Sequence, residues 1–140
     1  MTVAAAPRVA SVVATAFLVG GILGFVPGVT TRFGALELAG RDSRAQVFGV
    51  FDVSVLLLLV YALLGLAGLA LARTATGARR YLVGAGAVCA ALWIFGLVVA
   101  RDDAANFIPV DEADTWLHFG LGAILLVGYV PHQKDAAKTT

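Results

Sequence analysis

Two ionisable residues near the carboxyl end of the chain have the spacing of a chemically active pair. Asp114 and His118 are four residues apart, so on a helix they share one face, where a carboxylate can orient an imidazole or raise its proton affinity. They lie where an apolar stretch begins, and an ionisable side chain at such a place suggests a function. The structural alternative is that Asp114 and Thr115 cap a helix, while His118 bonds to a neighbouring helix.

A second set of polar residues begins another apolar stretch. Asp52 and Ser54 lie at its mouth and Tyr61 lies within it. We expect these residues to face the same outer vestibule as Asp114 and His118, where they would hold a quinone, a lipid head group or a proton path. No P-loop, nucleophile elbow, CxxC pair, HExxH or dinucleotide-binding fingerprint occurs in the sequence, so no recognisable catalytic class is indicated.

We expect neither a metal ion nor another cofactor. Hard cations accept carboxylate clusters, but the available side chains match no ligand motif and a solvated acidic loop explains them: Asp102, Asp103, Asp111, Glu112, Asp114 and His118. Haem held by two histidines would need both of them buried, and His132 falls in a polar tail. Nothing in the sequence indicates nucleic acid as a partner.

The elements that position these residues are too apolar for a soluble domain. Of 140 residues, 60% are hydrophobic and 14% are charged, against about 25% charged in soluble proteins; the mean hydropathy is +0.91. Four apolar stretches approach or reach the length that crosses about 30 Å of hydrocarbon: residues 9–26, 53–72, 81–100 and 115–130. The sequence therefore predicts an all-α, polytopic membrane protein, with residues 1–140 forming one bundle of four transmembrane helices, and it excludes a soluble enzyme.

The fourth stretch is short for a membrane span. Sixteen residues extend only about 24 Å as a helix. Filling the hydrocarbon core then requires that the acidic residues 111–114 join the helix, or that the bilayer becomes thinner there. Trp116, near the start of this stretch, suits the aromatic belt at the membrane interface.

The charges orient the chain in the membrane. An even number of crossings puts the tails, residues 1–8 and 131–140, on one side, together with the short connection at 73–80. That side carries six basic residues and one acidic residue, a net charge of +5, whereas the other carries four basic and eight acidic residues, a net charge of −4. Because basic residues near span ends stay in the cytoplasm, we expect both termini to face the cytoplasm from the plasma membrane. A cleaved signal peptide ending near Ala16 is the alternative for the first stretch, but the apolar run continues past that point.

Glycines predict how the helices pack. Small residues let helix backbones approach closely inside lipid, and the candidates occur at helical spacings: Gly20, Gly24, Gly28, Gly65, Gly68, Gly120 and Gly122. These contacts lie either within one bundle or against another subunit, so a partner membrane protein and a homo-oligomer both remain open.

A weak internal repeat relates the two halves of the chain. Each half has an apolar helix followed by Phe-x-Pro, at residues 25–27 and 107–109, and then a returning helix. This 2+2 parallel repeat aligns Tyr61 with His118 and places both at about the same depth.

Several segments, taken in chain order, resemble one protein family. GILGFVPGVT at residues 21–30, GLAGL at 65–69, ARRYLVG at 78–84 and DTWLH at 114–118 resemble the four-helix bacterial membrane family called domain of unknown function 4383, which is common in actinobacteria. The resemblance covers residues 9–129 and implies a four-span fold without an established activity. Members often carry two histidines four residues apart at the start of the second helix. One alignment places Leu57 and Tyr61 there, which puts a role for paired histidines in doubt, although Tyr61 can hydrogen-bond toward His118.

Together these features favour a small accessory or interaction protein of the plasma membrane, without catalytic activity. The alternative is a small transport or ligand-binding protein with an outward-facing vestibule for a lipid, a quinone or a proton.

Overall fold

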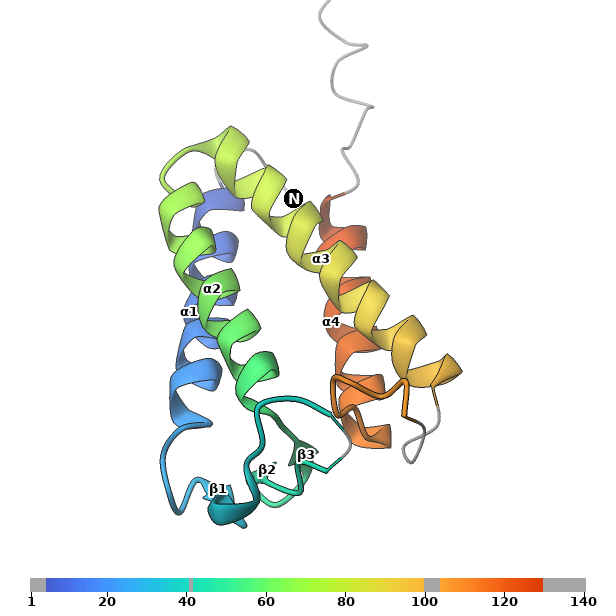
Figure 1. The fold of residues 1–140 in the computed structure, drawn as a ribbon. Coiled ribbons are helices and arrows are strands. Elements are labelled where there is room, and N and C mark those ends of the chain that lie inside the picture. The colour runs from blue at the N-terminus through green and yellow to red at the C-terminus, as the bar shows by residue number, and fades with distance from the viewer. Residues whose placement is uncertain (1–4, 41, 100–103, 130–140) are drawn as a thin grey trace, which may run out of the picture.

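The computed structural model describes residues 5–40, 42–99 and 104–129, and this part of the chain is mostly helical (Figure 1). The four helices are α1 (Ala6–Leu23), α2 (Val55–Leu71), α3 (Ala75–Val98) and α4 (Glu112–Tyr129). Between α1 and α2 lie β1 (Thr30–Thr31), β2 (Gln46–Val47), β3 (Phe51–Asp52) and the 3-10 helix η1 (Phe33–Ala35). The tail predicted for residues 131–140, and with it His132, lies outside the described residues, as do Asp102 and Asp103.

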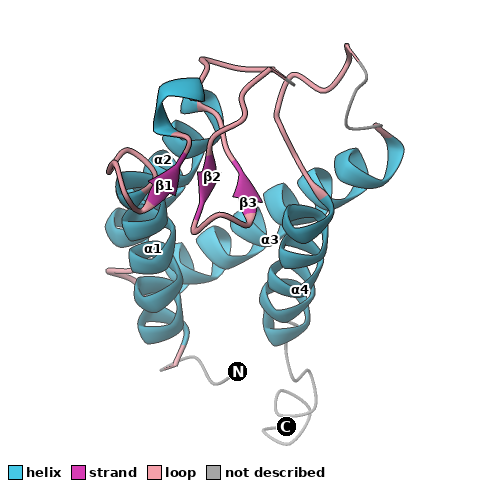
Figure 2. Cartoon of the chain, turned by 90° about the horizontal axis from the view of Figure 1, so that it is seen from below, coloured by secondary structure: helices cyan, strands magenta, loops and turns pink. Residues whose placement is uncertain are grey.

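The three strands are a departure from the all-α prediction. They form an antiparallel sheet in the order β1-β2-β3, with Thr30 opposite Val47 and Gln46 opposite Asp52. The turn between β2 and β3 uses positive φ angles at Phe48 and Gly49. Strands of two residues are too short to show the alternation of apolar and polar residues by which a strand is recognised in a sequence. The sheet belongs to the cap, residues 24–40 and 42–54, which lies across one end of the helices (Figure 2).

Local residues set the helix ends. Pro7 is in the first turn of α1, and the helix ends at Leu23, earlier than the predicted residue 26, because Pro27 follows and Gly28 has a φ of +99°. Ser54 caps α2 by accepting a hydrogen bond from the backbone N–H of Leu57 at 3.2 Å.

The third helix begins six residues before the predicted residue 81. Thr74 caps α3 by accepting from the backbone N–H of Gly77 at 3.0 Å, so the first turns of the helix include Arg79 and Arg80. The fourth helix begins at Glu112, so Glu112 and Asp114 of the acidic segment 111–114 lie in its first turn and Asp111 precedes it.

The helices pack as two pairs. α1 lies along α2 and α3 lies along α4, and the two pairs spread apart toward the cap (Figure 1). At the opposite end a buried cluster brings the pairs together, with small residues from three helices: Ala6, Ala10, Ala14, Ala72, Ala78 and Ala85. The predicted 2+2 repeat agrees with this pairing and stays a prediction.

Some of the predicted glycines lie in helix contacts, and others do not. A Cβ added to Gly65 would lie 2.5 Å from the backbone nitrogen of Leu18. Added Cβ atoms would also collide with side chains at Gly24 and Gly68, and one at Gly122 would lie 3.3 Å from the nitrogen of Ala90.

Three predicted positions have no such neighbours. A Cβ on Gly20, Gly28 or Gly120 would meet no described atom within 4 Å, so none of them closes a contact between described parts of the chain. The α1 backbone instead approaches α2 at Gly21, whose added Cβ would lie 2.7 Å from the nitrogen of Ala62. Spacing alone could not tell which of the adjacent Gly20 and Gly21 faces the neighbouring helix.

Two of the helices, α1 and α3, are long and apolar enough to cross a membrane, judged by length and composition. The apolar helix α2 has 17 residues. The first and third predicted spans therefore correspond to helices that could serve as spans.

Candidate functional site

The site begins where α4 starts, against the cap. The carboxylate of Asp111 accepts a hydrogen bond from the backbone N–H of Asp114 at 2.7 Å, and the carboxyl of Asp114 accepts from the backbone N–H of Asp111 at 3.4 Å. This reciprocal pair is a capping box, which satisfies free N–H groups at a helix start. The predicted N-cap position of the helix, at Asp114 and Thr115, is thus about one turn too late. Asp111 is the N-cap residue, and the carboxyl of Asp114 accepts the second bond of the pair, from the backbone N–H of Asp111.

Hydrogen bonds connect the cap to this helix start. The backbone N–H of Asp52 donates to the carboxylate of Asp111 at 3.3 Å, and the amide of Gln46 donates to the carboxylate of Asp52 at 2.9 Å. The guanidinium of Arg32 donates in turn to the amide oxygen of Gln46. The bonds form a polar chain from the exposed Arg32 to the half-buried Asp111, just before α4.

The polar residues predicted to line a vestibule are buried. Asp52, Ser54, Asp114 and His118 are each at most 4% exposed. Ser54 is engaged as the cap of α2. An open outward vestibule around these side chains is therefore absent from the part of the chain that the structure describes.

Asp114 lies just before the apolar stretch that begins at Thr115. Burial raises the pKa of its carboxyl to about 9, and the neighbouring charge of Asp111 acts in the same direction. A pKa raised in this way favours the protonated carboxyl at neutral pH.

One helical turn further, His118 pairs with Tyr61 of α2. Tyr61 Oη and His118 Nε2 are 2.7 Å apart, and the ring of Phe17 in α1 lies against Tyr61 with a centroid distance of 5.7 Å. His118 is fully buried, and its Nδ1 makes no hydrogen bond to a described residue. The side-chain partner of His118 is therefore a residue of a neighbouring helix, as in the structural alternative, and not the carboxylate of Asp114.

An apolar groove lies beside Tyr61. Its volume is about 280 Å³, and it is lined by three helices, α1, α2 and α4: Val12, Val13, Ala16, Phe17, Gly20, Tyr61, Leu117 and Leu121. Tyr61 provides the only hydroxyl group among these lining residues. A ligand in this groove would therefore be surrounded by hydrocarbon, with a Tyr–His hydrogen bond at one wall.

A larger cavity, of about 620 Å³, is lined by the end of α3 and the start of α4. Asp111, Glu112, Thr115 and Trp116 contribute to its lining, and none of the predicted vestibule residues does. Trp116 itself is 54% exposed and packs edge to face on Phe119.

Asp111, Gln46 and Phe17 were not among the predicted site residues. The Asp-x-x-Asp spacing before an apolar run is a recognisable capping signal, so the role of Asp111 as the N-cap residue of α4 could have been predicted. Gln46 and Phe17 carry no such signal, because each reaches the site through a contact between distant segments. Among the described residues, no group of three or more His, Cys, Asp and Glu side chains is placed to hold a metal ion.

A comparison with protein families places the chain in a family. The model described as "Domain of unknown function (DUF4383)" matches residues 8–130, in agreement with the resemblance noted in the sequence. No curated protein and no solved structure matches the chain.

Proposed function

Since the chain belongs to the DUF4383 family, a domain of unknown function, we propose from its own geometry that it is a four-span membrane protein that binds a lipid-soluble ligand between its helices. The observation that carries this proposal is the Tyr61–His118 hydrogen bond of 2.7 Å at the wall of an apolar groove. The proposal places α1 and α3 in the bilayer together with residues 55–71 and 115–129.

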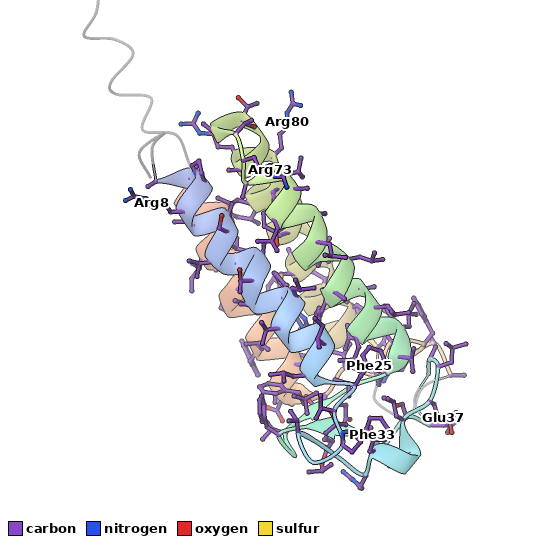
Figure 3. The ribbon with its side chains drawn as sticks, turned by 90° about the vertical axis from the view of Figure 1, so that its left-hand side faces the viewer. Arg8, Phe25, Phe33, Glu37, Arg73 and Arg80 are labelled. Carbon is purple, nitrogen blue, oxygen red and sulfur yellow. The ribbon has the colours of Figure 1, made fainter. Side chains whose placement is uncertain are left out.

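The outer faces of the helices support a membrane location. Large apolar side chains are strongly exposed on all four helices, among them Val12, Leu63, Val98 and Ile124. Large exposed apolar side chains on every helix are more than a soluble monomer usually carries. Arg8, Arg73 and Arg80 lie at one end of the molecule and Glu37 lies at the other (Figure 3), so the proposal puts the arginine end in the cytoplasm, beneath the plasma membrane.

The ligand proposed for the groove has a hydrocarbon chain and one hydrogen-bonding head. The apolar lining favours a chain, and the hydroxyl of Tyr61, which is hydrogen-bonded to His118 behind it, is the polar group that the head would approach. A quinone has this chemistry, because its carbonyl oxygens accept hydrogen bonds and its tail is apolar. The groove is open at the side, where a molecule dissolved in the bilayer would enter.

Filling the groove is expected to abolish binding. Gly20 lines the groove and has no neighbour within 4 Å of an added Cβ, so Gly20→Leu adds a side chain there without a clash inside the chain. We expect at least a tenfold weaker affinity for a radiolabelled short-tail quinone, measured with purified protein in detergent. Tyr61→Phe is expected to weaken binding about five- to tenfold through the lost hydrogen bond.

The matched control is Gly84→Leu, which places the same side chain on a similarly open glycine of α3 outside the groove. It should bind the quinone as the natural chain does. Equal affinity in the Gly20 variant, or no saturable binding at all, would contradict the proposed ligand site.

A second candidate function is that of a small accessory protein that packs on a partner subunit. The outer face of α3 favours it, because Gly84, Ala87 and Ala91 are exposed and follow each other at helical spacing. Small residues permit close approach by another helix. Gly84→Leu should then reduce crosslinking to a partner or a second copy severalfold. Gly24→Leu should instead destabilise the folded chain, because its side chain would collide with Leu58. Unchanged crosslinking in the Gly84 variant would exclude this face.

A further inference from the structure

Four arginines lie at the end of the molecule opposite the cap. Arg8 is in α1, Arg73 is in the turn between α2 and α3, and Arg79 and Arg80 are in the first turns of α3. Figure 3 shows Arg8, Arg73 and Arg80 at one end, whereas Phe25, Phe33 and Glu37 lie at the other. We call these four residues the arginine cluster.

Close backbone packing holds the arginine cluster together. Ala6, Ala10, Ala72 and Ala78 are buried in one cluster of small side chains, so the start of α1, the end of α2 and the start of α3 meet there. Around that contact, Arg8, Arg73 and Arg80 are exposed and Arg79 is half-buried.

The positive charge of the cluster is not compensated by described acidic residues. The acids of the described part all belong to the cap or to the start of α4: Glu37, Asp42, Asp52, Asp111, Glu112 and Asp114. None of the four guanidinium groups forms an ion pair with a described residue. The cluster therefore attracts an anion from outside this part of the chain.

We propose that the arginine cluster binds the phosphate of an anionic membrane lipid. Guanidinium groups bind phosphate oxygens with two parallel hydrogen bonds. Apolar surface begins beside the charges, since Val12 is 70% exposed one turn after Arg8, and Leu71 is 42% exposed beside Arg73. A lipid matches both features, because its phosphate meets the arginines and its acyl chains cover the adjoining hydrocarbon.

This inference rests on the membrane location in the proposed function, and it is independent of the quinone groove. Juxtamembrane basic residues attract the anionic lipids of the cytoplasmic leaflet. The proposal goes further by assigning one end of this chain, built from three helices, as the place where such a lipid is retained.

The test measures lipid retention by the purified full-length protein. The protein in neutral detergent is mixed with phosphatidylglycerol or phosphatidylcholine, and bound lipid is counted by native mass spectrometry. We expect phosphatidylglycerol to be retained at least tenfold better. The double variant Arg73→Gln/Arg80→Gln should lose about 10- to 30-fold of that affinity, in line with the contribution of each basic residue near a membrane surface.

The matched control is Arg32→Gln/Arg44→Gln, which removes two exposed arginines of the cap and should leave retention unchanged. Equal loss in both double variants would overturn the proposal, as would equal binding of the two lipids. A third arm uses inorganic phosphate alone: if it displaces phosphatidylglycerol at low millimolar concentration, the cluster is a site for free phosphate and the lipid assignment is overturned.

The membrane orientation is tested separately in whole cells. Thr76 beside the cluster and Leu38 in the cap are both exposed, so Thr76→Cys and Leu38→Cys are labelled with a membrane-impermeant maleimide. Labelling of Leu38→Cys alone supports the orientation on which the inference rests. If Thr76→Cys is labelled instead, the proposed orientation is wrong, even where phosphatidylglycerol is retained. If Leu38→Cys alone is labelled but the protein shows no preference for phosphatidylglycerol, only the lipid site is overturned.

Discussion

Gly65→Ala is expected to lower the free energy of unfolding by about 3 kcal/mol, as overpacking at a site that cannot relax does. The added Cβ would lie 2.5 Å from the backbone nitrogen of Leu18 and 2.6 Å from its Cα. Backbone atoms cannot turn aside as the end of a side chain can, so α1 and α2 would have to separate. The measurement is the loss of helical circular dichroism as SDS is added to protein in mixed micelles.

The control for this variant is Gly84→Ala, at a helical glycine with no atom within 4 Å of an added Cβ. Alanine is favoured over glycine within a helix by about 0.5–1 kcal/mol, so this variant should be slightly more stable than the natural chain. The same substitution thus has opposite signs at two glycines. Equal effects at both would show that α1 and α2 do not approach each other at Gly65.

Asp114→Asn is expected to remove much of the dependence of stability on pH. Burial raises the pKa of Asp114 to about 9 in the folded chain, whereas an unfolded aspartate titrates near pH 3.9. Between these values the folded state binds the proton more tightly than the unfolded state, so the free energy of unfolding falls as pH rises. The favourable contribution is complete below about pH 4 and is lost as the pH approaches 9.

The experiment compares SDS unfolding of both proteins at pH 5, 7 and 9. The natural chain should lose stability relative to the Asn variant at each step, since asparagine stays neutral throughout. Glu112→Gln, on the same helical turn but exposed, should keep the slope of the natural chain. If the Asn and natural chains keep parallel profiles, Asp114 does not carry a proton at neutral pH.

The helices were predictable because their apolar runs are long. All four predicted stretches overlap helices, and the errors lie at the ends, where single residues decide. Pro27 and Gly28 end α1 early, and the Thr74 cap starts α3 early. The sheet of the cap was not predictable, because strands of two residues, such as Gln46–Val47, leave no periodic pattern.

The site was predictable only where residues share a helix or align between the halves. Aligning the halves related Tyr61 to His118, and the two side chains do form a hydrogen bond. The structural alternative did place Asp114 at a helix start, but as the capping residue itself, whereas Asp111 is the capping residue and Asp114 accepts the return bond. The groove depends on how far the two helix pairs spread, a property of the packed chain that no single segment encodes.

The pairing of the helices has a consequence for the order in which the molecule is made. Each pair, α1 with α2 and α3 with α4, is formed by helices that follow each other in the sequence, so the first pair can be complete before the second leaves the ribosome, as units of a chain usually fold during synthesis. The bonds of Asp52 to Asp111 and of Gly40 to Phe107 join the cap to the last part of the chain. They can form only after residues 107–111 have been synthesised, so they fix the cap to the start of the second helix pair after the first pair has formed.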